Sequence, residues 1–565
     1  MPIIGIDLGT TNSLAAYFTE DGPVIIPNSF GEHLTPSIVS VGEDGEIYTG
    51  KIAAERRLTC PEMTASVFKR SMGTKKEYKL GDKSFLPEEL SSFIIKKLKE
   101  DAEIFLGEPI EEAVISCPAY FSDAQRRATK TAGELAGLRV ERIVSEPTAA
   151  AIAYGLHESD GNSKYLIFDL GGGTFDVSIL DYADNIMEVR AVAGDNYLGG
   201  EDFNEVLIGM FLRTHDISPE GLTLRQAAAL YKAAETAKLE FSKSKEVVMQ
   251  CTLEDETYAM PVSLSEYEKN CELVLARLKV PVVRAMSDAS VRLADVNAVV
   301  LVGGATKLPL VRNFVGKLFG MLPAQGINPD EAVALGAAIQ AAMKERNAYI
   351  KELLLTDVCP YTLGTSVSVL RSNGLYQSGS FLPIIERNTV IPASKVERLY
   401  TLRDNQTVVD VEILQGENRK ARDNIFLGQI SISMPPAPAG NEAVDVRYTY
   451  DINGILEVEV TTVSTGLMKK IIIEKNPGVV SEDEIKKRFE DLSSLKIHPR
   501  DRDEYRYLLE KGERLYQEHT GALRQRIAEA LADFDAALDG QDRGAIDEAA
   551  LVLREFYEVV EAYNE

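Results

Sequence analysis

The sequence predicts a multidomain protein with a two-lobed α/β domain, then an antiparallel β-sandwich and then a short α-helical segment. Three observations predict this order: a strand-and-turn motif occurs twice, strands alone follow residue 358, and helical periodicity dominates after residue 480. We therefore expect four parts, which comprise residues 1–351, 352–358, 359–479 and 480–565.

The composition is that of a globular protein without nucleic-acid or membrane partners. Hydrophobic residues make up 45% and charged residues 26%, and 565 residues exceed what one hydrophobic core accommodates. The 61 basic and 87 acidic residues give a net charge of -26, which opposes binding to nucleic acid. The apolar runs are too short to span a bilayer and the N-terminus has no signal-peptide pattern, so we expect a cytoplasmic protein.

A repeated motif is the strongest signal in the first part of the chain. Residues 3–11 read IIGIDLGTT and residues 165–174 read YLIFDLGGGT. In each copy an apolar run reaches Asp-Leu-Gly, a turn rich in Gly and Thr follows, and strand-forming residues resume, which predicts two β-hairpins. Helical periodicity in residues 87–103, 123–136 and 224–241 completes two similar α/β lobes.

Strands and then helices dominate the rest of the chain. Antiparallel sheets are predicted by the alternation of apolar and polar residues in segments 408–414, 430–433, 444–450 and 455–460. The later helices begin at a Ser-x-x-Glu capping box in residues 481–484 and break at Pro499, Gly521 and residues 540–544. They suit either an appendage of the sandwich or a coiled dimerisation element.

Each copy of the motif places a carboxylate beside a turn that suits phosphate and magnesium. Glycines let backbone N–H groups approach anionic oxygens, hydroxyl groups add donors, and the carboxylate holds the water shell of the metal. Asp7 and Asp169, one in each lobe, predict a clamp on the β- and γ-phosphates of a nucleotide. The alternative is two glycine-rich hairpins with surface acids. The sequence contains no P-loop.

The motifs resemble those of the actin, sugar-kinase and 70-kDa heat-shock superfamily. Within it the chain resembles the heat shock protein 70 (DnaK-like) chaperone family, and its compact length resembles the bacterial HscC-type branch. The matching segments are residues 6–13, 146–151, 169–176, 199–203, 302–309, 328–332 and 414–417.

The resemblance implies an actin-like ATPase domain, a peptide-binding sandwich and a helical lid. ATP binding and hydrolysis would control the exchange of hydrophobic segments of unfolded proteins, with ATP or ADP, Mg²⁺ and K⁺ as cofactors. A J-domain co-chaperone and a nucleotide exchange factor are further implied partners. Small-molecule kinases and actin-like filament ATPases of the same superfamily are the alternatives.

The resemblance also implies the residues of the phosphate site. Lys69 would face the γ-phosphate and the attacking water, Glu146 would position water, and Asp7 and Asp169 would hold Mg²⁺ mainly through water. The alternative for Lys69 is a solvated surface lysine. Thr174 and Asp176 would complete the catalytic group, and the phosphates would be bound by Gly9, Thr10, Thr11, Asn12, Gly171, Gly172, Gly173 and Thr174.

The adenosine side is implied in the same way. Lys307 stands where many relatives have arginine, which stacks better on adenine, so we expect weaker nucleotide binding or faster release. For Glu235 and Lys238 the alternative is an ordinary ion pair on a helix surface. The implied adenosine residues are Glu235, Lys238, Ser242, Gly304, Lys307 and Asp330. Gly200, Glu201 and Gly303 are further implied nucleotide-binding residues.

The apolar linker carries the implied coupling between the domains. Leu353, Leu354 and Leu355 would dock on the ATPase domain when ATP is bound. Arg142 would also contact a J-domain, and the relay residues would be Pro118, Arg126, Arg142 and Asp357. The peptide channel of the sandwich would be lined by Thr365, Leu399, Val409 and Val411, for which core packing is the alternative.

Overall fold

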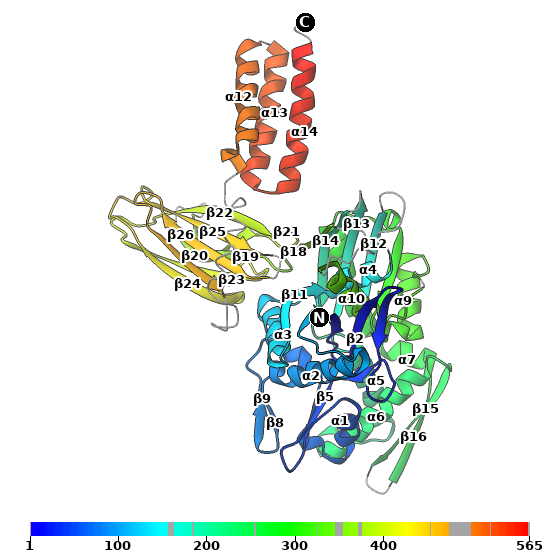
Figure 1. Ribbon diagram of the computed structural model, residues 1–565. Helices are drawn as coiled ribbons and strands as arrows, with labels where there is room; N and C mark the ends of the chain where they lie inside the picture. The colour runs from blue at the N-terminus through cyan, green and yellow to red at the C-terminus, as the bar shows by residue number, and fades with distance from the viewer. Residues whose placement is uncertain are drawn as a thin grey trace. The chain divides into compact units, whose positions relative to one another are not determined.

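The computed structural model describes residues 2–155, 163–183, 186–253, 256–324, 326–344, 354–370, 376–451, 454–473, 499–519 and 521–562. The chain divides into two compact units, Met1–Pro360 and Tyr361–Glu565. Strands and helices alternate in the first unit, whereas the second contains strands followed by helices (Figure 1). The first unit extends to Pro360 and therefore includes the described part of the predicted linker.

Two sheets with the same strand pattern form the framework of the first unit. Within this unit one runs β11-β10-β1-β2-β3 and the other β17-β12-β13-β14-β18. The first strand of each motif, β1 or β12, pairs antiparallel with its hairpin partner and parallel with a later strand. Both predicted hairpins and the internal duplication are thereby confirmed. The bounds are β1 (Ile3–Asp7), β2 (Asn12–Thr19), β3 (Gly22–Ile26), β10 (Glu112–Cys117), β11 (Arg139–Ser145), β12 (Ser163–Leu170), β13 (Phe175–Ala183), β14 (Ile186–Asp195), β17 (Ala298–Val302) and β18 (Leu354–Val358).

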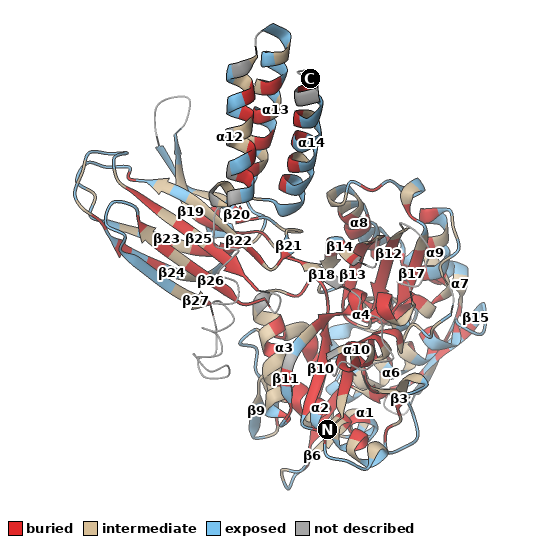
Figure 2. Ribbon diagram, turned by 45° about the horizontal axis from the view of Figure 1, so that its top comes forward, coloured by how far each residue is buried: buried red, intermediate tan, exposed pale blue. Residues whose placement is uncertain are grey.

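Helices cover these sheets, and the strands are correspondingly buried. Every residue of β10 is buried, as expected of an inner strand that is covered on both faces. Figure 2 shows buried residues along the strands of both sheets. The three helices that periodicity predicts are confirmed as α2 (Pro87–Leu106), α3 (Asp123–Leu135) and α6 (Leu224–Glu240).

Two helices rich in small residues pack closely against each other in the first unit. They are α4 (Glu146–Ala153) and α10 (Ala332–Lys344). A Cβ atom on Gly336 of α10 would lie only 1.8 Å from the carbonyl oxygen of Ala149 in α4. A Cβ atom on Gly5 would lie 2.2 Å from the backbone nitrogen of Ala338, so α10 also packs closely on β1. Glycine is therefore required at both contacts.

Replacing Gly336 by Ala is expected to destabilise the first unit by about 1–3 kcal/mol, because the helices must separate to admit the methyl group. Gly316, in α9 (Pro309–Phe319), is the matched control, since a Cβ atom there meets nothing within 4 Å. Gly316→Ala should stabilise by about 0.5–1 kcal/mol through the helix preference of alanine. Thermal unfolding of both variants checks the opposite signs, and an unchanged melting temperature for Gly336→Ala would contradict the close packing.

The apolar linker forms a strand of the second sheet rather than a free spacer. β18 lies parallel to β14, with Leu354 opposite Ile186 and Leu355 opposite Met187. Leu353 and the side chains of Leu354 and Leu355 lie outside the described residues. The backbone pairing nevertheless places this segment on the same sheet as the second hairpin.

The second unit contains a sandwich of two antiparallel sheets. Their strand orders are β20-β19-β23-β24 and β22-β25-β26-β27. The buried hydroxyl group of Tyr448 donates to the carbonyl oxygen of Gly364 in the opposite sheet at 2.8 Å. The bounds are β19 (Leu363–Leu370), β20 (Tyr376–Ile385), β22 (Ala393–Tyr400), β23 (Val408–Gln415), β24 (Ile425–Ser433), β25 (Ala443–Tyr450), β26 (Leu456–Thr462) and β27 (Met468–Ile473). The antiparallel prediction is confirmed.

Three described helices follow the sandwich and share a core of their own. They are α12 (Asp503–Glu518), α13 (Gly521–Gly540) and α14 (Arg543–Ala562), and they end near the predicted breaks. Leu515, Ile527 and Phe534 are among the side chains buried between them. The predicted capping box in residues 481–484 lies outside the described residues. In the described part of the chain, no helix has the length and apolar character to cross a membrane.

Candidate functional site

A cavity of about 350 Å³ in the first unit is lined by residues of both hairpins. Segments far apart in the sequence converge here, because each lobe contributes one turn. Most of the predicted residues line it, namely Asp7, Gly9, Thr10, Thr11, Asn12, Lys69, Glu146, Asp169, Gly171, Gly172, Thr174, Gly200, Glu235, Lys238, Ser242, Gly303, Gly304, Lys307 and Asp330.

The two predicted phosphate turns approach each other closely. A Cβ atom on Gly172 would lie 1.8 Å from Thr11 Oγ1, so only glycine permits this approach. The second turn is held by the start of α5 (Gly200–Thr214). The N–H group of Gly200 donates to the carbonyl oxygen of Gly171 at 2.9 Å, and that of Glu201 donates to Gly172 at 2.8 Å. The shape of this turn is therefore fixed by the protein itself.

Lys69 and Glu146 form a buried ion pair at the cavity. The Lys69 Nζ atom lies 2.9 Å from Glu146 Oε1, and the side chains are 3% and 9% exposed. Burial lowers the pKa of Lys69, but the carboxylates of Glu146 and Asp7 outweigh this effect and the pKa is raised overall. Lys69 therefore carries a positive charge in the site, and its alternative interpretation as a solvated surface lysine is wrong.

Three aspartates beside this pair resist ionisation. Burial, followed by the charge of Glu146, raises the pKa of Asp7 to about 7, although a hydrogen bond from Ser116 Oγ at 2.8 Å opposes the rise. The same two causes raise the pKa of Asp169 well above its usual range and that of Asp176 to about 7. The site thus concentrates more negative charge than Lys69 offsets, and a cation would stabilise the ionised carboxylates.

The cavity offers unused oxygen atoms to such a cation and to phosphate groups. Asp169 Oδ2 and Thr11 Oγ1 are buried and have no hydrogen-bond partner among the described residues. Carboxylate oxygens suit Mg²⁺, and a hydroxyl group can donate to a phosphate oxygen. Among the described residues, no three His, Cys, Asp or Glu side chains form a group that could hold a metal ion. Magnesium bound here would thus also need oxygens from phosphate and water.

The first unit without nucleotide and metal is expected to lose stability as the pH rises from about 4 to about 7. The native state raises the pKa of Asp176 from 3.8 to about 7, so the stability present below pH 3.8 disappears once the carboxyl group ionises. This difference corresponds to about 4 kcal/mol over the whole range. Asp176→Asn should remove this part of the pH dependence. Unfolding of both proteins between pH 4 and pH 8 measures it, and parallel curves would contradict the assignment.

The predicted adenosine residues lie on α6 and on the segments after β17. Lys238 is buried and its Nζ atom donates to the carbonyl oxygen of Gly200 at 3.1 Å, which ties α6 to α5. Burial lowers the pKa of Lys238, and Glu235 opposes the shift. Lys238 is therefore a buried cavity residue that bonds to Gly200, and an ordinary ion pair with Glu235 on the helix surface does not describe it. Lys307, in the short helix Gly304–Lys307, forms an ion pair with Asp330.

Three residues of the predicted nucleotide site, Gly173, Asp176 and Glu201, do not line the cavity but form hydrogen bonds beside it. Asp176 accepts a hydrogen bond from the backbone N–H of Tyr120 at 3.0 Å. Glu201 accepts one from the hydroxyl group of Tyr231. The carbonyl group of Gly173 accepts a hydrogen bond from Arg70.

Sequence reasoning missed the apolar residues of the cavity. They carry no local signal, because apolar residues at helical or strand spacing also form cores. Leu239 is an exception in the structure, since it is 62% exposed although it is large and apolar. The missed residues are Leu14, Leu34, Leu239, Val302, Ala305, Leu308, Pro329 and Val333.

The predicted relay residues lie on two segments near the site. Arg126 is buried and its Nη2 atom donates to the carbonyl oxygen of Ala119 at 3.0 Å, which braces the turn after Pro118. Asp176 holds the same turn through Tyr120, so this turn is tied to the second hairpin.

The charge of Asp357, near the end of the linker strand, shifts the pKa values of two residues of the first sheet. Burial lowers the pKa of Arg142 on β11, and the charge of Asp357 opposes that shift. Burial raises the pKa of the Cys117 thiol on β10 to about 11, and Asp357 contributes to that rise. Asp357 is therefore close enough to influence the ionisation of groups on β10 and β11.

The predicted peptide-channel residues do not share one environment. Thr365 and Val411 are buried inside the sandwich, as core packing would place them. Leu399 and Val409 are half-buried and reach the surface. A peptide could therefore contact the latter two without rearrangement of the sheets.

Comparisons with known proteins agree with this arrangement. The Hsp70 protein family matches residues 3–559. The proteins named chaperone protein DnaK from Thermotoga petrophila and Thermotoga maritima are each 42% identical over 504 residues, which cover 86% of this chain and 83% of theirs. The chaperone protein DnaK of Thermosipho africanus is 42% identical over 516 residues, which cover 89% of this chain and 84% of its own. The chain therefore belongs to the Hsp70 family.

Proposed function

We propose that this Hsp70 protein is an ATP-dependent chaperone that binds and releases extended hydrophobic segments of unfolded proteins. The observation that carries the proposal is the cavity that joins two duplicated turns with the buried pair of Lys69 and Glu146. ATP hydrolysis at this cavity controls how fast the sandwich exchanges its peptide.

The charges of the site suit phosphoryl transfer to water. Hydrolysis joins a water oxygen to the γ-phosphorus and breaks the bond from that phosphorus to the bridging oxygen, so that ADP and phosphate leave and the water gives up a proton. Negative charge shifts toward the leaving oxygen during this step. The fixed ammonium group of Lys69 would offset negative charge on the γ-phosphate, and Glu146 would orient the water. Asp7 and Asp169 would hold Mg²⁺, which neutralises phosphate charge when bound. Thr10 and Thr11 line the same cavity, and their hydroxyl groups would donate to phosphate oxygens.

The family assignment does not favour the alternative of a small-molecule kinase or an actin-like filament ATPase. The Hsp70 match continues to residue 559 and so includes the sandwich and the final helices, for which those alternatives have no use.

The proposal also includes one further cofactor, a K⁺ ion at the phosphate site, and two partners, a J-domain co-chaperone at Arg142 and a nucleotide exchange factor. It further places the protein in the HscC-type branch and in the cytoplasm. Helices α12, α13 and α14 would form the lid, which their separate core supports. Leu399 and Val409 would contact the bound peptide.

The test uses the full-length protein with ATP and a fluorescent unfolded peptide. We expect peptide to stimulate ATP hydrolysis and ATP to accelerate peptide release. Sugars should neither stimulate hydrolysis nor become phosphorylated, as they would with a small-molecule kinase. ATP should not make the protein sediment, as it would if the protein formed actin-like filaments. ATP hydrolysis that is indifferent to peptide, together with phosphorylation of a sugar, would overturn the proposal.

A further inference from the structure

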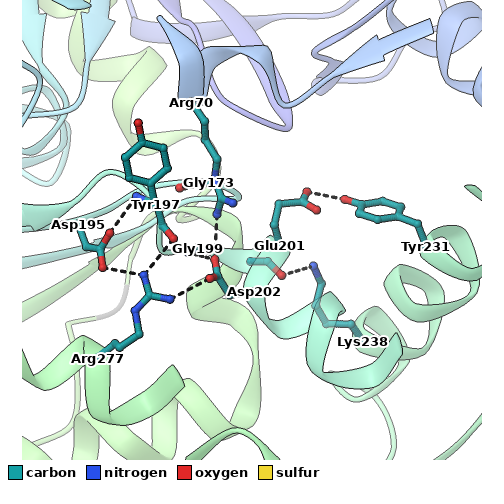
Figure 3. Close-up of polar contacts among 11 residues, drawn as sticks. Arg70, Gly173, Asp195, Tyr197, Gly199, Glu201, Asp202, Tyr231, Lys238 and Arg277 are labelled. Atoms are coloured by element: carbon teal, nitrogen blue, oxygen red, sulfur yellow. Dashed lines mark hydrogen bonds and ion pairs between the residues drawn. The ribbon is translucent and has the colours of Figure 1, made fainter. Parts of the chain in front are cut away.

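The turn that carries Lys69 also carries a residue that reaches the other lobe. Arg70 follows Lys69 in the short helix Phe68–Ser71. Its Nε atom donates to the carbonyl oxygen of Gly173 at 2.8 Å, and its Nη2 atom donates to Asp202 Oδ2 at 2.9 Å. Figure 3 shows the Arg70 side chain extending from the N-terminal part of the chain to both partners. One guanidinium group thus ties this turn to the second phosphate turn and to α5.

The bond to Gly173 sets the direction of the neighbouring peptide group. A trans peptide is planar, so the N–H group of Thr174 points away from the carbonyl group that Arg70 holds. Gly172 and Thr174 line the cavity, whereas Gly173 does not. A Cβ atom on Gly173 would lie 2.4 Å from the Thr10 side chain and 2.9 Å from Arg70 Nε, so the first turn packs at the same point. Arg70 therefore fixes the face that the second turn presents to phosphate.

The other partner, Asp202, is held firmly by its own lobe. Its Oδ2 atom accepts the N–H group of Gly199 at 2.9 Å, and its Oδ1 atom accepts Arg277 Nη1 at 3.1 Å. Arg277 also donates to Asp195 at 2.8 Å and to the carbonyl oxygen of Tyr197 at 3.1 Å (Figure 3). These contacts all lie between β14, α5 and α8 (Glu272–Asp288).

Arg70 differs from Arg277 in burial as well as in position. The Arg70 and Asp202 side chains are 21% and 17% exposed, whereas the Arg277 side chain is 44% exposed. Charge-assisted hydrogen bonds in the less hydrated position contribute more, and a guanidinium group can bond a carbonyl and a carboxylate at once.

We propose that Arg70 is a positioning residue that ties the turn of Lys69 to the second phosphate turn and so keeps the two lobes closed on bound nucleotide. Because both residues share one short turn, bringing Lys69 to the cavity also docks Arg70 on the second phosphate turn. Arg70 thereby retains nucleotide by holding the second turn against it. This inference rests on the proposed binding of nucleotide phosphates at the cavity.

The test measures two rates in the full-length protein: release of fluorescent ADP and single-turnover hydrolysis of bound ATP. Arg70→Ala should release ADP at least about tenfold faster, which corresponds to about 1.4 kcal/mol. Hydrolysis of ATP already bound should change less than release does, since Lys69 and Glu146 keep their ion pair. Arg70→Lys should be intermediate, because an ammonium group lacks the planar fork.

Arg277→Ala is the matched control, because it removes a partner of Asp202 within one lobe only. ADP release should then change clearly less than in Arg70→Ala. An unchanged release rate in Arg70→Ala, or an equal acceleration in Arg277→Ala, overturns the inference. If Arg70→Ala melts below the assay temperature, Asp202→Asn replaces it, and the expected acceleration is smaller because the bond of Arg70 to Gly173 remains. Failure of the wild-type protein to bind ADP would instead refute the proposed function.

Discussion

Lys69→Ala is expected to bind ATP and to hydrolyse it at least about a hundredfold more slowly than the wild-type protein. The substitution removes the one ammonium group that the described structure places in a buried pair beside Asp7 and Asp169. Loss of a fixed charge or donor at a site of developing negative charge typically costs that much or more. Single-turnover hydrolysis measures the chemical step, and equilibrium binding of a fluorescent ATP analogue measures retention of the nucleotide.

The same substitution leaves Glu146 buried without its partner, so a control must separate lost stability from lost chemistry. Lys97 supplies that control, since its Nζ atom lies 2.7 Å from Asp101, whose side chain is 2% exposed and distant in the sequence from the cavity residues. Lys97→Ala should lower the melting temperature and leave hydrolysis unchanged. Near-normal hydrolysis by Lys69→Ala would show that the cavity acts through another group.

Replacing Leu354 and Leu355 together by Asp is expected to abolish the acceleration of peptide release by ATP. Coupling between sites typically amounts to about 1–3 kcal/mol, or about 5- to 150-fold, and this factor should fall close to one. Aspartate is unfavourable in strands, and two new charges beside Asp357 oppose the pairing of β18 with β14. Stopped-flow release of a fluorescent peptide, with and without ATP, measures the factor.

A charge added to another strand of the same unit tests whether the effect is specific to the linker. Val248 is 55% exposed on β15 (Glu246–Leu253), so Val248→Asp introduces a charge without affecting β18. Its ATP acceleration should equal that of the wild-type protein. Nucleotide affinity should be unchanged in both proteins. If the double Asp variant still releases peptide faster with ATP, pairing of β18 is not the coupling element.

The chemistry-bearing part of the site could be predicted because its residues occur in local motifs. Asp7 and Asp169 each end a strand before a turn, and this pattern is legible within ten residues of sequence, as the pairing of β1 with β2 and of β12 with β13 confirms. The apolar residues of the cavity could not be predicted, because residues such as Leu308 and Val333 show the same sequence pattern as core residues.

Long-range contacts explain the other differences between prediction and structure. The role of Arg70 depends on Gly173 and Asp202, which lie in another lobe and carry no complementary local pattern. The apolar linker could be recognised from the sequence, but its pairing with β14 could not. β14 lies far earlier in the chain, and no local pattern links the two segments. Asp176 matched the motif and lies opposite Asp169 in the hairpin, yet its carboxylate accepts the N–H group of Tyr120, which comes from a segment distant in the sequence.

The pairing of β18 with β14 also bears on aggregation. β14 is joined to β13 on one side, and β18 covers its other side. If β18 leaves, the N–H and C=O groups of β14 from Ile186 to Glu188 lose their partners and form an open sheet edge. An open edge can recruit any extended chain, including that of a client polypeptide. When the linker strand leaves, the exposed edge of β14 would therefore need protection by water, by nearby charges or by another strand.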